Sequence, residues 1–358
     1  MLGRISRALA LAAALAVGCG ASAAHAAPVP NDFFGLDYRP AHPAPQPEVS
    51  ALGIGITRQV FDWAGIEAAP GRYRFSYYDD YVLTMARQGI AVLPVLLGTP
   101  RYRSSAPRRH PRRGFWPPRH PRDLGAFAAL LVRRYGPGGA LWREHPDVSP
   151  VPVRAWQVWN EPNLPVYWPS GPSPRAYTRL LKAVSRAIRR ADPGATVVSA
   201  GIPQSRLGMP LLAFVRGMYR AGARGSFDQL GVSAYGRSAG SILWRLGTVR
   251  AVMNARHDRR AGIWVTEVGW ATDGPRTPFT STAAGQARLI GALLRGAARR
   301  RAALGLRGLI YYTWADQRPS APSADFWGLH TGLVGADGAP KPGYFAFRDS
   351  ARALEATG

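Results

Sequence analysis

Cysteine is nearly absent from this chain, since Cys19 is the only one among 358 residues. A mature protein beginning near Ala27 would hold no disulfide and would depend on a large core for its stability. No apolar run reaches the about 20 residues that a membrane-spanning helix needs, so we expect no transmembrane segment. The motifs H-E-x-x-H, G-x-S-x-G and the P-loop are also missing. The seven His are scattered, and we expect no metal and no cofactor.

Acidic residues and lysine are scarce. Lys and Arg number 46 against 21 Asp and Glu, which gives a formal net charge of +25, and lysine occurs only at 182 and 341. Such a charge is compatible with nucleic-acid binding. However, the arginines are spread along the chain without a nucleic-acid-binding motif, so we interpret them as GC-rich codon usage and expect no nucleic-acid partner. Attraction to an anionic glycan or to the cell envelope stays open.

The N-terminus has the pattern of a secretory signal peptide. Two arginines precede the apolar run Ala8–Val17, and Ala24-His25-Ala26 offers a small-x-small cleavage site. We therefore expect residues 1–26 to be removed and residues 27–358 to form one secreted or periplasmic domain. A membrane anchor is disfavoured because the run is too short. A lipoprotein anchored at Cys19 is the second alternative, because a weak lipobox ends there.

Short apolar runs alternate with amphipathic helical stretches along the rest of the chain. The runs carry few charges, as expected for strands that are covered on both faces. The predicted strands are Phe33–Tyr38, Gly55–Phe61, Ala91–Leu97, Val153–Trp159, Thr196–Gly201, Leu230–Tyr235, Ile263–Thr266 and Gly308–Thr313. Eight strands with intervening helices predict an α/β protein built as a single (β/α)₈ TIM barrel. A doubly wound sheet is the alternative, but no G-x-G-x-x-G follows the first strand.

Start and stop signals mark several helices between these strands. The sequence predicts a helix that begins at Ser173-Pro174, one capped by Asp123 that runs to Tyr135 and ends at Gly136, one from Thr282 toward Arg301, and a last one over Phe345–Leu354.

Two long loops follow the third and the eighth predicted strands, at residues 101–122 and 316–331. Loops after barrel strands lie on the face where barrels build active sites. The first loop is dense in Pro, Arg and His, and a solvated, poorly ordered insertion is an equal alternative for it.

Two segments place a glutamate directly after an apolar strand: Trp159-Asn160-Glu161-Pro162-Asn163 and Trp264-Val265-Thr266-Glu267-Val268-Gly269-Trp270. The carboxyl ends of all barrel strands open on one face, so Glu161 and Glu267 should share one site. Burying a carboxylate there costs free energy unless it has a partner or a role. Cleavage of a glycosidic bond needs such a pair, one as acid and one at the anomeric carbon. Carboxylates roughly 5–5.5 Å apart give retention, and wider spacing gives inversion.

Polar and aromatic residues at other strand ends fit the same site. Arg58 could hold Glu267 ionised, and Tyr235 could donate a hydrogen bond to it. Each residue alone also has an ordinary structural explanation, as a core side chain or as one half of an ion pair. The candidates to contact a sugar are Asn160 by hydrogen bonding and Trp270 and Trp314 by stacking.

These motifs resemble those of the clan A glycoside hydrolases, and most of all glycoside hydrolase family 39 and its distant bacterial relatives. The similarity runs from Phe33-Phe34-Gly35 through Thr57-Arg58 to Pro340-Lys341-Pro342, and the two glutamate motifs are its most specific part. It implies a retaining mechanism with Glu161 as acid/base and Glu267 as nucleophile. It also implies that Asn160 contacts the sugar 2-hydroxyl, and that Arg58 and Tyr235 support the nucleophile.

The sequence departs from this pattern at Ser233, where such relatives often carry a His two residues before the tyrosine of the sixth strand. The smaller, uncharged side chain bears on sugar specificity rather than on the carboxylate chemistry. We predict a secreted, monomeric glycosidase that cleaves a β-linked poly- or oligosaccharide, with a β-xyloside, a β-glucan or an exopolysaccharide as candidate substrates. A non-catalytic glycan-binding barrel and a basic envelope-binding protein are the alternatives.

Overall fold

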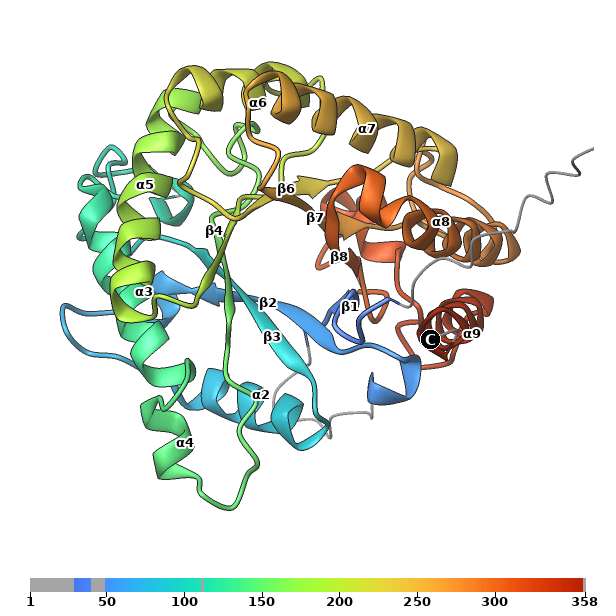
Figure 1. Cartoon of the computed structure of the whole chain (residues 1–358), viewed down its shortest axis with the longest axis horizontal. Helices are drawn as coiled ribbons and strands as arrows, with labels where there is room; N and C mark the ends of the chain where they lie inside the picture. Colours follow the sequence, from blue (N-terminus) through green and yellow to red (C-terminus); the bar gives the residue numbers. More distant parts are fainter. Residues whose placement is uncertain (1–28, 40–48, 111–112, 357–358) are drawn as a thin grey trace, which may run out of the picture.

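Eight parallel strands close into a barrel in the computed structural model of this protein, which describes residues 29–39, 49–110 and 113–356. Each strand pairs with the next along the chain, and the last pairs with the first. Figure 1 looks into the barrel and shows helices around its outside. The predicted (β/α)₈ barrel is confirmed, and a doubly wound sheet is excluded because an open sheet has no such closure. The predicted signal segment and Cys19 lie outside the described residues.

All eight predicted strands are present, with bounds that differ from the prediction by at most two residues. They are β1 Phe34–Asp37, β2 Ile56–Asp62, β3 Ala91–Leu97, β4 Ala155–Val158, β5 Thr196–Ser199, β6 Gln229–Ser233, β7 Gly262–Val268 and β8 Leu306–Tyr311.

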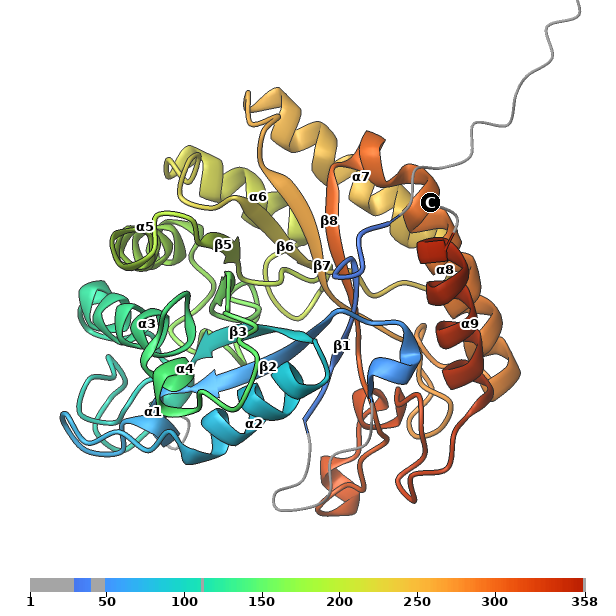
Figure 2. The ribbon, with the colours of Figure 1, turned by 60° about the horizontal axis from the view of Figure 1, so that its bottom comes forward.

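Helices cover the outer face of the strands, as Figure 2 shows from a second direction. They are α1 Trp63–Ile66, α2 Ser76–Arg87, α3 Pro121–Tyr135, α4 Ala140–Glu144, α5 Pro174–Ala191, α6 Leu211–Arg220, α7 Ala239–Ala255, α8 Ala283–Leu304 and α9 Pro342–Ala356, with the short 3₁₀ helices η1 Val49–Leu52, η2 Arg113–Phe115, η3 Pro322–Ala324 and η4 Trp327–His330. Within the described ranges, none of these helices is both long and apolar enough to cross a membrane.

Most of the residues that the sequence predicts to start or end a helix do so in the structure. Ser173 accepts a hydrogen bond from the Ala176 amide at the start of α5, Thr282 caps α8 in the same way, and Gly136 ends α3. The prediction that Asp123 caps α3 is wrong, because α3 begins at Pro121. Proline suits the first turn since its missing N–H has no partner there. Asp123 instead lies within that turn, where a carboxylate interacts favourably with the helix dipole.

The barrel interior is filled by its own apolar cluster, separate from the core between strands and helices. It consists of one buried residue from each of six strands: Ile56, Leu93, Ala155, Val198, Trp264 and Ile310. Side chains alternate along a strand, so Arg58 and Gln157, each two residues further on, also face inward but closer to the carboxyl ends. The barrel therefore has an apolar floor and a polar mouth.

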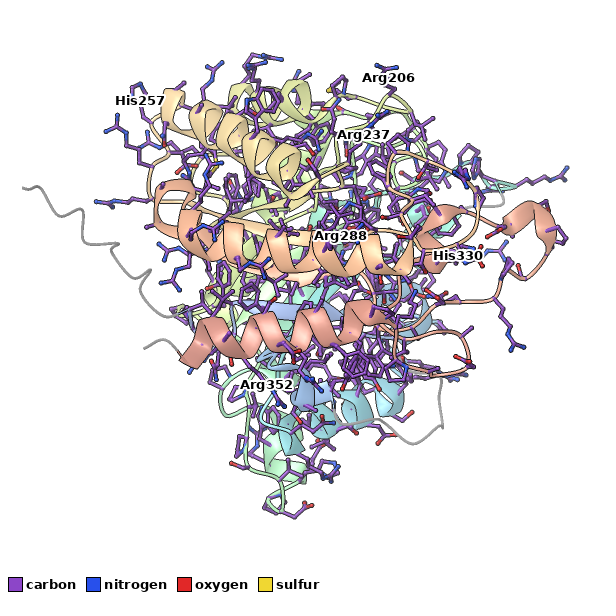
Figure 3. The ribbon with its side chains drawn as sticks, turned by 90° about the vertical axis from the view of Figure 1, so that its right-hand side faces the viewer. Arg206, Arg237, His257, Arg288, His330 and Arg352 are labelled. Atoms are coloured by element: carbon purple, nitrogen blue, oxygen red, sulfur yellow. The ribbon has the colours of Figure 1, made fainter. Side chains whose placement is uncertain are left out.

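The outer surface is strongly basic along several helices. Neither α5 nor α8 contains an acidic residue, although each carries at least five basic ones. Figure 3 looks onto α8 and α9, with Arg288 and Arg352 on these two helices. Part of the positive charge of the chain thus lies on the outer wall.

Candidate active site

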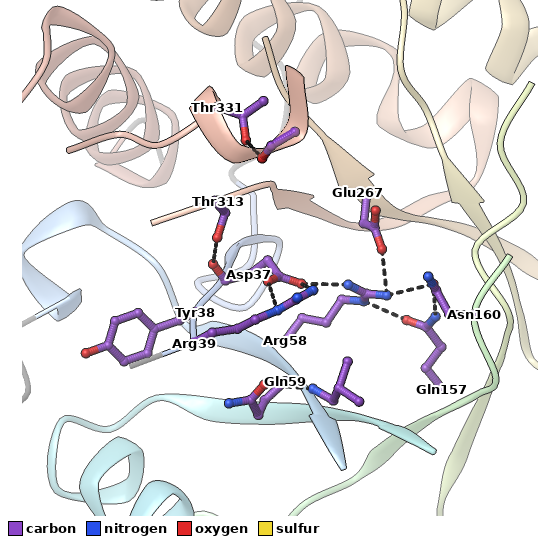
Figure 4. A network of polar contacts seen from close by, with 12 residues as sticks. Asp37, Tyr38, Arg39, Arg58, Gln59, Gln157, Asn160, Glu267, Thr313 and Thr331 are labelled. Carbon is purple, nitrogen blue, oxygen red and sulfur yellow. Dashed lines mark hydrogen bonds and ion pairs between the residues drawn. The ribbon is translucent and has the colours of Figure 1, made fainter. Parts of the chain in front are cut away.

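Arg58 is the centre of a buried polar network at the mouth of the barrel (Figure 4). Its Nη1 lies 2.6 Å from Asp37 Oδ2, and its Nε donates to Gln157 Oε1 at 2.9 Å. Its Nη2 donates to Asn160 Oδ1 at 2.9 Å and lies 2.9 Å from Glu267 Oε1. The side chain is 1% exposed. Two carboxylates therefore compensate a guanidinium that would be costly to bury alone.

A bulge in β7 turns Glu267 toward this network. Trp264 belongs to the inward cluster and Val265 to the outer core, so strict alternation would point residue 267 outward. The pairing with β6 shifts so that Val232 faces Val265 but Ser233 faces Glu267. Bulges of this kind re-aim side chains near active sites. The sequence prediction placed Glu267 correctly at the mouth but did not include the bulge that directs it there.

Tyr235 supplies a second donor to Glu267. Its hydroxyl donates to Glu267 Oε2 at 2.9 Å, while Arg58 faces Oε1. Both carboxylate oxygens therefore face donors, which is an arrangement suited to an anion. The predicted grouping of Arg58, Tyr235 and Glu267 is present in the structure.

Glu161 reaches the same mouth through a sharp turn after β4. The backbone φ angles of Trp159 and Glu161 are +71° and +40°, in the left-handed region that residues with a Cβ seldom adopt. Such a conformation costs about 1–2 kcal/mol per residue. The Glu161 amide donates to the Gly201 carbonyl at 3.1 Å, which ties the turn to the end of β5. Backbone strain of this kind concentrates at functional sites.

The environment of Glu161 favours its protonated form. Burial raises the pKa of this carboxyl well above its usual value, and the negative charge of Glu267 raises it further. The charge of Arg58 acts in the opposite direction and does not outweigh these two effects. The surroundings of Glu161 thus favour its neutral form, whereas those of Glu267 place a guanidinium and a hydroxyl donor on its two oxygens.

Ser233, where the sequence departs from the family 39 pattern, ends β6 opposite Glu267 in the strand register. Its hydroxyl is near enough to act against the rise in the pKa of Glu161, although its geometry makes no regular hydrogen bond with a described residue. A Cβ on Gly201 would lie 2.6 Å from Ser233 Oγ and 2.3 Å from Thr266 Oγ1. Only glycine fits there, because the backbone of Gly201 packs closely against two hydroxyl groups.

Both long loops reach the mouth of the barrel. Phe115, in the loop after β3, packs edge-on against Tyr167 with ring centroids 5.5 Å apart. The charges of Glu161 and Glu267 both act on Tyr167, whose pKa is raised chiefly by burial. Trp327, in the loop after β8, packs against Tyr235 at 4.8 Å. At Phe115, the first loop is therefore folded onto the site rather than extended into solvent.

The two tryptophans predicted to stack on a sugar differ in exposure. Trp270 is 1% exposed and donates from Nε1 to the Gly236 carbonyl at 2.8 Å. Its ring has no face open to a ligand here, and it holds the segment that carries Tyr235. Trp314 is only partly buried and meets Tyr38 edge-on at 6.0 Å. It is the one of the two that can line a sugar subsite.

Several site residues escaped the sequence prediction. Asp37 ends β1 directly opposite Arg58 in the strand register, and Gln157 lies on the inward face of β4. Arg39 follows Asp37, and Tyr312 follows β8. The rule that found Glu161, a polar residue at the end of an apolar strand, also applies to Asp37. Within the described part of the chain, no group of three or more His, Cys, Asp or Glu could hold a metal ion.

The fold and the carboxylate-bearing mouth define a (β/α)₈ barrel of the kind found in glycoside hydrolases. No protein-family model matches the chain, and no curated protein matches it by sequence. A family 39 glycoside hydrolase from the gut symbiont Bacteroides cellulosilyticus is similar, with a TM-score of 0.67 and 19% identity over 91% of this chain and 64% of that one. The chain thus spans somewhat less than two thirds of that enzyme's length.

Other similar structures are also glycosidases. A monomeric β-xylosidase from Caulobacter crescentus has a TM-score of 0.62 and 20% identity, covering 90% of this chain and 68% of that chain. An exo-β-1,4-mannosidase from an Opitutaceae bacterium has a TM-score of 0.57 and 19% identity, covering 90% and 59%. Sequence identities this low support a shared fold but not a shared activity.

Proposed function

We propose that this protein is a retaining glycoside hydrolase that cleaves a β-linked oligo- or polysaccharide. The observation that carries the proposal is the contrast between its two glutamates. Glu267 receives Arg58 and Tyr235 on its two oxygens, whereas burial and the neighbouring negative charge raise the pKa of Glu161. Two carboxyl groups whose environments differ in this way are the usual basis for dividing acid and nucleophile roles.

The reaction follows from these positions as a double displacement. Glu161 protonates the glycosidic oxygen as Glu267 attacks the anomeric carbon, which gives a glycosyl ester of Glu267. Glu161, now ionised, then removes a proton from water as that water attacks the same carbon. The ester bond breaks and Glu267 leaves as a carboxylate, so both groups return to their starting states. Two inversions at one carbon give net retention.

Asn160 is oriented to hold the substrate. Its Oδ1 accepts from Arg58 Nη2 at 2.9 Å, so its Nδ2 is the side that remains for a sugar hydroxyl, as the family resemblance implies for the 2-hydroxyl. Hydrogen bonds to this hydroxyl strengthen in the transition state of glycosidases. The similar structures include a β-xylosidase and an exo-β-1,4-mannosidase, which supports a β-linked substrate. We further propose export through residues 1–26 and a monomeric state.

The proposal is tested by a screen of aryl glycosides and β-linked polysaccharides with product analysis by NMR, in which the first-formed anomer should retain its configuration. Glu267→Ala should abolish turnover. Glu161→Ala should slow poorly activated leaving groups far more than aryl ones. Glu67→Gln is a matched control, because Glu67 is also buried but is bonded to the Trp63 indole and to Arg103 instead of to Arg58 and Tyr235. Glycan binding without turnover in the wild type would favour the non-catalytic barrel.

A further inference from the structure

Trp327 is an aromatic side chain at the barrel mouth that the double displacement does not use. It begins η4, in the loop after β8, and it is only partly buried. Its ring meets that of Tyr235 edge-on, with centroids 4.8 Å apart and an interplanar angle of 80°, and it lies 4.9 Å from the ring of Phe279. Edge-to-face pairs are favourable because the positive edge of one ring meets the negative face of the other. Trp327 therefore contacts one residue that follows β6 and one that follows β7.

The ring of Tyr235 packs against residues that follow other strands. Tyr235 comes two residues after the end of β6, and its hydroxyl donates to Glu267 Oε2 at 2.9 Å. Three aromatic rings lie around it, those of Trp327, Phe279 and Tyr312, with centroids 4.8, 5.9 and 6.4 Å away. All three follow β7 or β8 in the chain. Trp327 lies closest of the three, so its loss would remove the nearest wall from the ring that carries the donor.

Contacts on both sides of Trp327 fix its place. Asp325 and His330 flank it in the sequence, and His330 Nε2 lies 2.7 Å from Asp325 Oδ1, which closes the turn around η4. The Thr272 amide donates to the His330 carbonyl at 2.9 Å. The imidazole of His330 also packs so closely against Gly274 that a Cβ there would collide with it. Thr272 and Gly274 belong to the loop after β7, so the loops after β7 and β8 support each other.

A largely buried ion pair ties the same two loops together at their base. Lys341 Nζ lies 2.8 Å from Asp316 Oδ2 and donates to Thr272 Oγ1 at 2.9 Å. The Gly332 amide donates to Asp316 Oδ1 at 2.8 Å. Asp316 begins the loop after β8 and Gly332 directly follows it, so the loop is closed where it leaves the barrel. This closure restricts the positions that Trp327 can take.

The direction of the Tyr235 hydroxyl decides whether it can serve Glu267. Burial and, next, the negative charge of Glu267 raise the pKa of Tyr235 well above its usual value, so the hydroxyl keeps the proton that it donates. A hydrogen bond weakens steeply as its angle departs from linear. Removing Trp327 would leave a cavity beside the ring into which the ring could turn, because neighbouring groups fill such cavities only in part. Packing at Trp327 is thereby linked to the hydrogen bond at Glu267.

Resting on the proposed glycosidase site, we infer that Trp327 is a positioning residue for the reaction. It holds the ring of Tyr235 so that the hydroxyl donates to Glu267 Oε2, and it acts through Tyr235 rather than by touching the substrate. The nucleophile then depends on the loop after β8 as well as on Arg58. A change at Trp327 alters the rate of the chemical step and leaves the affinity for the substrate nearly the same.

A double-mutant cycle tests this inference, because it measures whether Trp327 acts through Tyr235. Trp327→Ala should lower kcat on an aryl β-glycoside about 3–10-fold, the range of an edge-to-face aromatic pair, with little change in KM. In a Tyr235→Phe background no hydroxyl is left to direct, so the same substitution should lower kcat by less than about 2-fold. Trp327→Phe keeps a ring beside Tyr235 and should restore most of the loss. Phe326→Ala is the matched control, because Phe326 directly precedes Trp327 and is 48% exposed, and it should leave kcat and KM unchanged.

A measurement on the resting protein does not depend on turnover. In protein labelled with 3-fluorotyrosine, the fluorine NMR signal that Tyr235→Phe removes is that of residue 235. We expect Trp327→Ala to shift or broaden this signal, because the ring loses its nearest neighbour, and Phe326→Ala to leave it in place.

The outcomes separate this inference from the proposed function. Turnover in which Trp327→Ala has the same effect with and without the Tyr235 hydroxyl, or raises KM alone, overturns the role of Trp327 and leaves the glycosidase intact. Equal losses of kcat in Trp327→Ala and Phe326→Ala reflect damage to the whole loop and also overturn it. If the wild type cleaves no glycoside, the glycosidase is overturned, and the fluorine signal decides whether Trp327 holds Tyr235: a response to Trp327→Ala supports this and an unchanged signal overturns it.

Discussion

Asp37 and Arg58 face each other in register on β1 and β2, and their side chains meet 2.6 Å apart inside the barrel. Arg58 in turn reaches Glu267 on β7, on the other side of β1 and β8. A carboxylate on one strand thereby fixes the guanidinium that orients a second carboxylate. The position of the proposed nucleophile therefore depends on this relay as well as on the bulge in β7.

Replacement of Arg58 tests the relay. Arg58→Met keeps most of the side-chain volume but leaves Glu267 buried without its cation, and Asp37 with Arg39 as its one remaining cationic partner among the described residues. Removing one partner of a buried ion pair typically costs about 3–5 kcal/mol. We expect a loss of that size in the free energy of unfolding, measured with denaturant, together with a loss of at least about 100-fold in kcat.

Arg250→Met is the matched control for this variant. Arg250 is also buried, and it donates to the carbonyl oxygens of Leu304 and Ala261 away from the barrel mouth. It should lower stability without changing kcat of the folded fraction. Equal losses of kcat in the two variants would show that Arg58 contributes to folding alone.

Tyr235→Phe removes one hydroxyl from the site and little else. The ring still packs against Trp327 and Phe279, whose centroids lie 4.8 and 5.9 Å away. The lost hydrogen bond to a charged group is worth about 1.5–3 kcal/mol, which corresponds to about 10–100-fold in kcat/KM. Steady-state kinetics on one aryl glycoside would measure it. An unchanged rate would mean that Arg58 alone positions Glu267.

The sequence predicts the barrel well because its signals are local. Each strand is an apolar run with few charges, and each glutamate stands directly after such a run. The closed ring follows from the number and alternation of the elements, and the shared site follows from the parallel direction of the strands. The sequence alone therefore groups Arg58, Tyr235 and Glu267.

The parts that escaped prediction depend on three-dimensional packing. Nothing in the segment from Trp264 to Trp270 indicates that β7 bulges, because the bulge arises from its pairing with β6 and β8. The sequence also does not reveal whether a tryptophan at a strand end is buried, like Trp270, or partly exposed, like Trp314. The helix start at Pro121 was missed because Asp123 offered a competing cap two residues later.

The raised pKa of Glu161 gives stability a particular dependence on pH. A carboxyl whose pKa is higher in the folded state binds more protons there, so its stabilising effect is complete below the unfolded-state pKa and is lost as pH rises through the folded-state pKa. Glu161→Gln has no such loss. The variant should gain in free energy of unfolding over the wild type as pH rises from about 4 to 8, by up to about 1.4 kcal/mol per pH unit.

Glu67→Gln should show the opposite trend and is the control. Burial raises the pKa of Glu67, but hydrogen bonds from the Gly71 amide and the Trp63 indole outweigh it, so the net shift is downward. That carboxylate stabilises the fold above its unfolded-state pKa, and the stabilisation is lost at low pH. The variant should therefore be at its greatest disadvantage near neutral pH. If the free energy of unfolding of Glu161→Gln stayed constant or fell relative to that of the wild type as pH rises, Glu161 would not be the protonated partner.

Coupling between the two glutamates should be visible in the titration of Glu161 itself. Glu267→Gln removes the negative charge that adds to the effect of burial, so the pKa of Glu161 should fall in that variant while staying above its usual range. Carbon-13 NMR of the labelled carboxyl groups would follow this directly, and the alkaline limb of the activity profile reports the same group in the wild type. No change between the two proteins would indicate that the carboxylates are too far apart to share one anomeric carbon.

Substitutions of Trp270 and Trp314 should affect protein stability and substrate binding differently. Trp270→Phe leaves the Gly236 carbonyl without its donor in a buried setting, which costs about 1–3 kcal/mol. Thermal unfolding should show this loss, while KM of the folded protein changes little. Trp314→Ala removes a partly exposed ring at the mouth and should raise KM for oligosaccharides with a smaller loss in stability. The reverse pattern, with KM depending on Trp270 and not on Trp314, would place the sugar on the other side of the mouth, against β7.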